Sequence, residues 1–61
     1  MSYVEIWSTD KNRYDVNIIT EQKRNVVVDN IANTKDRSIA CFIAKEVARR
    51  NKLKIEFRID N

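Results

Sequence analysis

The sequence predicts an α+β fold, in which three strands, one helix and a fourth strand follow one another in a single domain over residues 1–61. We expect an antiparallel sheet of about four strands with the helix packed on one of its faces. Three observations favour this fold. Short segments alternate between apolar and polar residues, one later segment repeats its apolar residues at helical spacing, and the first connections are short and polar.

Residues 3–7, 13–20 and 25–29 are predicted to form the first three strands. In the second of these segments Tyr14, Val16 and Ile18 share one face, because successive side chains of a strand point to opposite sides. The third segment is short and β-branched, and its consecutive valines leave its register open. Polar connections at residues 8–12 and 21–24 are short enough to join these strands as an antiparallel meander.

The pattern then changes to the period of a helix, with apolar or small residues at Ile39, Ala40, Ile43, Ala44 and Val47. Asn33 or Thr34 is expected to cap the start of this helix. Asp36 lies three residues after Asn33, where a carboxylate complements the helix dipole. Asn51 is the candidate to end the helix in a left-handed conformation, since the chain contains no glycine.

Residues 53–60 show the most regular alternation of the chain and predict the last strand. Leu53, Ile55, Phe57 and Ile59 fall on one face, and charged residues fall on the other. The predicted core joins the apolar faces of the strands to the helix, and its members are Val4, Ile6, Tyr14, Val16, Ile18, Val26, Val28, Ile39, Ile43, Val47, Leu53, Ile55 and Phe57.

Composition argues against catalysis and against a bound cofactor. The chain has no histidine, so neither a serine–histidine pair nor one of the usual zinc sites is expected. Without glycine, no phosphate-binding loop of the familiar kinds can form. Cys41 is the only cysteine, which precludes an intramolecular disulfide and favours a reducing, cytoplasmic setting. We therefore expect a protein that is not an enzyme, with no catalytic residue, no metal and no cofactor.

No apolar run is long enough to span a membrane, and residues 1–8 lack the features of a signal peptide. The net charge is +3, and residues 35–61 carry eight basic and four acidic side chains. Such an asymmetry favours an anionic partner, although a solvated helix face would produce it as well. The amino-acid composition, rich in Lys, Asn, Ile and Asp, suggests a phage or mobile-element origin.

Two surfaces are candidates for partner binding. The strand period that buries Val4 and Ile6 places Tyr3 and Trp7 on the opposite, outer face of the sheet. That outer face should otherwise be mostly polar, with Ile19 and residues Glu5, Arg13, Asp15, Asn17, Lys54, Glu56, Arg58 and Asp60. Exposed aromatic residues among charges are frequent binding hot spots. Alternatively, Trp7 lies at a strand end and folds over the edge of the sheet.

The second candidate surface is a stripe on the helix, opposite its apolar face. At about 100° per residue, this stripe contains Ser38, Phe42, Lys45, Arg49 and Lys52. A phenylalanine among basic residues would suit an acidic partner. Alternatively, a small rotation of the helix tucks Phe42 under the third strand. Cys41 falls on the helix flank and is expected to be structural or merely exposed, because no histidine can activate it.

The short alternating N-terminal strands, the segment at residues 40–47 (ACFIAKEV) and the closing strand at residues 53–59 resemble small phage antitoxins of the Dmd type. Those antitoxins block an RNA-cleaving toxin of the host. The resemblance implies a protein of this size that binds and inhibits a host protein.

Two further resemblances compete with the first. Residues 13–16 (RYDV), the Lys23–Arg24 turn and residues 33–36 (NTKD) are similar to a DNA-binding domain of three strands and a helix. That domain occurs at the N-terminus of some integrases and in plant ethylene-response factors, and it reads DNA with its exposed sheet face. The order of strands and helix also resembles that of HicB-like antitoxin domains.

The leading hypothesis is therefore a phage-type accessory protein that binds and inhibits a host protein in the host cytoplasm, with an acidic surface as the expected contact. The alternative is a nucleic-acid-binding module. It would use either the exposed sheet face or the basic residues near the helix end, which are Lys45, Arg49, Arg50, Lys52 and Lys54. A third reading is a homodimer, formed through the outer sheet faces or an exposed edge strand; a monomer is equally compatible with the sequence.

Overall fold

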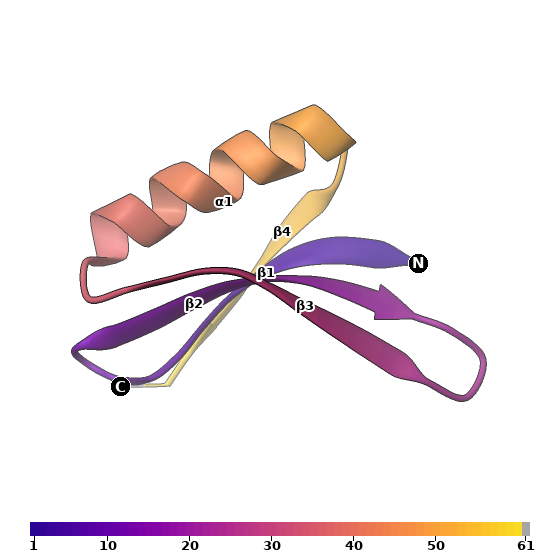
Figure 1. Cartoon of the computed structure of the whole chain (residues 1–61), viewed down its shortest axis with the longest axis horizontal. Helices are drawn as coiled ribbons and strands as arrows, with labels where there is room; N and C mark the ends of the chain where they lie inside the picture. The colour runs from indigo at the N-terminus through magenta and orange to yellow at the C-terminus, as the bar shows by residue number, and fades with distance from the viewer. Residues whose placement is uncertain (61) are drawn as a thin grey trace.

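The protein has two layers, a four-stranded sheet and one helix that covers a single face of it (Figure 1). This computed structural model describes residues 1–60. The elements follow the predicted order and are β1 (Ser2–Asp10), β2 (Arg13–Glu21), β3 (Val26–Thr34), α1 (Arg37–Asn51) and β4 (Lys54–Ile59). The predicted α+β fold class is confirmed.

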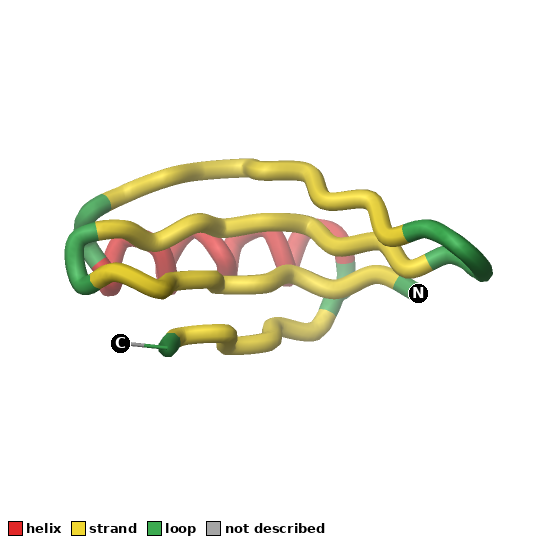
Figure 2. The backbone as a smooth tube through the Cα atoms, turned by 90° about the horizontal axis from the view of Figure 1, so that it is seen from below, coloured by secondary structure: helices red, strands yellow, loops and turns green. Residues whose placement is uncertain are grey.

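The strands lie in the order β3-β2-β1-β4, so β3 and β4 are the two edges of the sheet (Figure 2). Strand β2 pairs antiparallel with both β1 and β3, as the short turns require. Strand β4 instead pairs parallel with β1. The sheet is thus mixed, though mostly antiparallel. Strands β1 and β3 run in the same direction, and the helix returns the chain to the end of the sheet at which both strands start. Strand β4 therefore runs parallel to β1.

Strand β3 is longer than the predicted residues 25–29 and continues to Thr34. Val16 pairs with Ala32 but Asn17 pairs with Asn30, so Ile31 is an extra, bulged residue. This irregularity explains why alternation alone did not reveal the second half of the strand. The bulge reverses the parity of the strand, so that Asn30 and Asn33 point to the same side.

Both ends of the helix differ from prediction. The N-cap is Asp36, whose Oδ1 accepts hydrogen bonds from the backbone N–H groups of Ser38 at 2.8 Å and Ile39 at 3.3 Å. Asn33 and Thr34 cannot serve, because both still belong to β3. At the other end, Asn51 remains helical and Lys52 takes the left-handed conformation, with φ 56° and ψ 46°.

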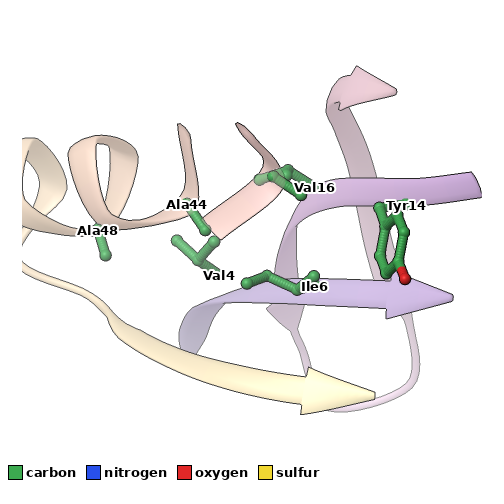
Figure 3. Close-up of a cluster of buried hydrophobic side chains, with 7 residues drawn as sticks. Val4, Ile6, Tyr14, Val16, Ala44 and Ala48 are labelled. Atoms are coloured by element: carbon green, nitrogen blue, oxygen red, sulfur yellow. The ribbon is translucent and has the colours of Figure 1, made fainter. Parts of the chain in front are cut away.

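The core lies between the helix and the face of the sheet beneath it (Figure 3). Val4, Ile6, Tyr14 and Val16 are buried as predicted. Opposite them the helix presents a line of small residues spaced one turn apart, Ala40, Ala44 and Ala48, which the predicted core omitted. Five further predicted members are only partly buried against this cluster, namely Ile18, Ile43, Val47, Leu53 and Ile55.

Four predicted core residues are exposed, which corrects the prediction: Val26, Val28, Ile39 and Phe57. Val26 and Val28 pair with Glu21 and Ile19, and they therefore share the outer face of the sheet. Ile39 is 49% exposed on α1 and does not belong to the buried line of alanines. Phe57 belongs to edge strand β4, which the helix covers least. Within residues 1–60, no helix has the length and apolar character that crossing a membrane would require.

Candidate binding surface on the open face of the sheet

No helix or strand within residues 1–60 covers the sheet face opposite α1 (Figure 2). It is hollowed into a concavity of about 540 Å³. We call this concavity the outer trough; its lining residues are Tyr3, Glu5, Trp7, Arg13, Asp15, Asn17, Ile19, Val26, Val28, Asn30 and Asn33. Strand β2 forms its floor, because Asp15, Asn17 and Ile19 are all buried, while β1 and β3 supply the two sides.

Strand register sorts the outer face into rows that cross all four strands. The apolar row consists of Val28, Ile19 and Tyr3, and Lys54 of β4 lies next to Tyr3 at its end. The middle row runs Asn30, Asn17, Glu5 and Glu56, and the third row runs Asn33, Asp15, Trp7 and Arg58. One end of the outer trough is therefore apolar. Its centre and its other end are polar, with a single aromatic side chain among them.

A chain of hydrogen bonds joins the side chains of the middle row. The Nδ2 group of Asn30 donates to Oδ1 of Asn17 at 2.8 Å, and Nδ2 of Asn17 donates to Oε1 of Glu5 at 3.1 Å. Asn30 also donates to the backbone carbonyl of Ala32 at 3.3 Å. The two hydrogen bonds between side chains both run toward Glu5, so the chain ends on a carboxylate.

The third row is fixed in the same way around Asp15. Its Oδ1 accepts a 2.6 Å hydrogen bond from Nδ2 of Asn33, and its Oδ2 lies 3.5 Å from Nε of Arg13. Asp15 and Asn17 are each only 7% exposed, although no element covers them. Every buried side-chain nitrogen and oxygen among residues 1–60 has a hydrogen-bond partner. These polar groups are consequently ordered before anything binds, which lowers the entropic cost of binding.

Tyr3 and Trp7 flank Glu5 on strand β1 and face the outer trough, as the sequence predicts. Tyr3 is half-buried, and Trp7 is 40% exposed. Strand β1 is an interior strand, so Trp7 does not fold over a sheet edge. On the other side of β1, Glu5 stands opposite Glu56 of β4. Two like charges directly opposite each other are unfavourable, so a cationic group bound next to Glu5 and Glu56 would be favourable here.

The predicted helix stripe is also at the surface. Phe42 is 66% exposed and is not tucked under β3, and Ser38, Lys45, Arg49 and Lys52 are exposed as well. Arg49 is not an uncompensated charge, because its guanidinium donates to Oε2 of Glu46 at 2.8 Å. This hydrogen bond, the charge of Arg49 and the more distant Arg50 lower the pKa of Glu46.

The structure separates the two predicted sets of binding residues. Tyr3 and Trp7 lie on the outer face of the sheet, whereas Phe42, Lys45, Arg49 and Lys52 are exposed on α1. That helix covers the inner face of the sheet (Figure 1). A single flat partner surface cannot contact both sets. The outer trough is concave and its polar side chains are held by hydrogen bonds. It is therefore a stronger candidate binding site than the helix stripe.

Sequence reasoning placed the β1 and β2 residues of the outer trough correctly and missed those of β3. Val26 and Val28 were assigned to the core, and Asn33 to the helix cap. The signal for these β3 residues is that Val26, Val28 and Asn30 alternate in step with the outer-face positions of β2. That signal depends on the register between β2 and β3, which local sequence does not specify.

Other chemistry is sparse. Cys41 is a half-buried thiol on the helix. Residues 1–60 contain no group of three or more Cys, Asp or Glu side chains placed to hold a metal ion. No protein-family model matches the chain, and searches of curated proteins and of solved structures found no match either. The fold and the surface together define a two-layer α+β protein with an open, hollowed sheet face.

Proposed function

We propose that this chain is a small non-enzymatic binding protein that holds a segment of a partner protein in the outer trough and thereby inhibits that partner. The observation that carries the proposal is the ordered polar lining of an uncovered, hollowed sheet face. Asp15 and Asn17 are buried there and hydrogen-bonded to neighbouring side chains, and Tyr3 and Trp7 line the same trough. Aromatic side chains next to fixed polar groups are typical of interface hot spots.

The charges of the outer face favour a protein over a nucleic acid. Glu5 and Glu56 stand side by side at its centre, and none of the ion pairs among residues 1–60 involves either of them. Carboxylates at this position would repel phosphates. An arginine or lysine of a partner protein would instead bind Glu5 and rest against the face of Tyr3 or Trp7. The apolar row would receive a neighbouring apolar side chain of the same segment.

The resemblance to Dmd-type antitoxins, together with a composition typical of phage genes, supports a host protein as the partner and the host cytoplasm as the place of action. The exposed stripe of Phe42, Lys45, Arg49 and Lys52 is a separate surface in this proposal. It would contact an acidic region of the same host protein only if that protein reached around an edge of the sheet.

The test is capture of proteins from bacterial cells that produce the tagged chain. We expect one protein to be recovered in a stoichiometric amount by the unmodified chain. A variant with both Tyr3→Ser and Trp7→Ser should bind this protein at least about a hundredfold more weakly and so lose most of the capture, since two hot-spot side chains contribute several kcal/mol. A matched variant with Phe42→Ser, Lys45→Ser and Lys52→Ser should recover as much as the unmodified chain. Circular dichroism checks that both variants remain folded.

Purified partner should then change the fluorescence of Trp7 in a saturable titration. Loss of capture only in the helix variant would move the site to the helix stripe and refute the proposal. Recovery of nucleic acid that disappears with nuclease, and binding that weakens steeply with salt, would favour the nucleic-acid alternative. Recovery of no stoichiometric protein from any plausible host would contradict the proposal altogether.

A further inference from the structure

The free edge of β3 presents unpaired backbone groups at defined positions. Met1 and Glu21 exchange both of their backbone hydrogen bonds, at 2.7 and 3.2 Å, so the polar groups of Glu21 point toward β1. Glu21 pairs with Val26, and the direction alternates along a strand. The N–H and C=O groups of Val26 and Val28 therefore point away from the sheet. Those of Val27 point inward to β2.

The side chains along this edge are apolar and exposed on both faces. Val26, Val27 and Val28 are 61%, 42% and 57% exposed. Natural edge strands usually carry charged residues such as lysine, or proline, and both discourage pairing. Strand β4, the other edge, follows that rule with Lys54, Glu56 and Arg58, and it has 6 residues. Strand β3 has 9 residues, and its only charged member is Asp29.

We infer that β3 pairs antiparallel with β3 of a second copy of this chain, with the two-fold axis beside Val27. The two sheets then join into one continuous sheet. In this register Val26 stands opposite Val28 of the second copy, and these are the residues whose backbone groups point outward on both chains. Val27 stands opposite its own equivalent. Val26, Val27 and Val28 of one copy thus pack beside the same three residues of the other copy.

Charge favours this register over the two registers shifted further along β3, and the valines that one copy presents match those of the other. With the axis beside Val27, Asp29 of each copy lies opposite Asn25 of the other and next to the basic turn residue Arg24. A shift of the axis to Val28 would instead place Asp29 opposite Val27, and a shift to Asp29 would oppose two carboxylates. Because the axis is perpendicular to the sheet, both outer troughs stay open on the same side. Val26 and Val28 belong to both the outer trough and the pairing contact, but the inference does not rest on the function proposed above.

The test exploits the pairing of Val27 with itself. Sedimentation velocity of the unmodified chain should show a mass that rises to a dimer with concentration. Val27→Lys should be monomeric at those concentrations, and so should Val27→Glu, because each sets two like charges opposite each other. An equal mixture of the two variants should dimerise again. That restoration is expected only if the two positions face one another, and it also shows that each variant is folded.

Proline provides a second test. Val28→Pro removes an N–H group that points to the free edge, so it should abolish dimerisation without breaking the β2 ladder. Phe57→Pro is the matched control on the other edge. The N–H of Asp60 donates to the carbonyl of Ser8 at 2.8 Å, so by alternation the N–H of Phe57 points outward from β4. A chain that stays monomeric at high concentration, a mixture that fails to dimerise, or equal effects of the two prolines would overturn the inference.

Discussion

Lys52 carries a backbone conformation that its side chain does not favour. It has φ 56° and is the one residue with positive φ among residues 1–60. Its N–H donates to the carbonyl of Ala48, and the N–H of Leu53 donates to the same carbonyl at 2.9 Å. The helix must stop here to let β4 begin at Lys54. In a chain without glycine, this left-handed position falls to a residue with a Cβ atom.

Replacing Lys52→Gly should therefore stabilise the protein, by roughly 1 kcal/mol, because glycine removes the cost of the left-handed conformation. Asn51→Gly is the matched control and should destabilise it by about 1 kcal/mol or more. Asn51 is still helical, and its Nδ2 donates to the carbonyl of Val47 at 2.8 Å. Urea denaturation of the three proteins measures both changes. A loss of stability in Lys52→Gly would contradict the assignment of the helix end.

At the scale of the elements, the contact between helix and sheet depends on small side chains. Ala40, Ala44 and Ala48 are 0%, 0% and 6% exposed and meet Val4, Ile6 and Val16, which are completely buried. Alanines spaced by four residues form one line on a helix and permit close approach of its backbone to the sheet. The larger apolar residues of α1, such as Ile43 and Val47, lie beside this line and are only partly buried.

Ala44→Leu should consequently destabilise the protein by about 1–3 kcal/mol, because a packed core has no room for added methylene groups. Lys45→Leu, at the next and exposed position, should change the free energy of unfolding by less than about 0.5 kcal/mol. Thermal or urea unfolding compares the two. Equal effects would mean that the helix is not held against the sheet through its alanines.

At the scale of the whole molecule, the first and last strands of the chain lie side by side, with β1 in the interior of the sheet and β4 at its edge. Strand β1 pairs with β2 through a tight turn, in which the N–H of Asn12 donates to Oδ1 of Asp10 at 2.9 Å. Its other neighbour is β4, where Tyr3 pairs with Lys54 near the opposite end of the sequence. Closing so long a loop costs entropy that the local hairpins do not incur. Strand β4 should therefore join the sheet late in folding.

Ile55→Ala in β4 should mainly accelerate unfolding, whereas Val16→Ala in β2 should also slow folding, because contacts made before the transition state affect the folding rate. Both side chains pack in or against the core, so each substitution should be large enough to interpret. Stopped-flow folding and unfolding rates in urea provide the measurement. A folding rate reduced more by Ile55→Ala than by Val16→Ala would reverse the proposed order.

Local periodicity by itself determined the element types and which side chains share a face within β1, β2 and β4. The alternation around Tyr3, Glu5 and Trp7 was sufficient to place them on the outer face, and the same holds for Asp15 and Asn17 in β2. Composition determined that the turns and caps would be made without glycine or proline. These properties depend on neighbouring residues in the chain, and a single sequence therefore contains them.

Tertiary structure alone decided the remainder. The bulge at Ile31, the parallel pairing of β4 and the assignment of Val26 and Val28 to the outer face all depend on which strands meet and in what register. The line of alanines on α1 is the buried contact with the sheet, while the larger Ile43 and Val47 lie beside it and are only partly buried. Pairing and packing join residues far apart in the chain, so their free energies cannot be read from local patterns.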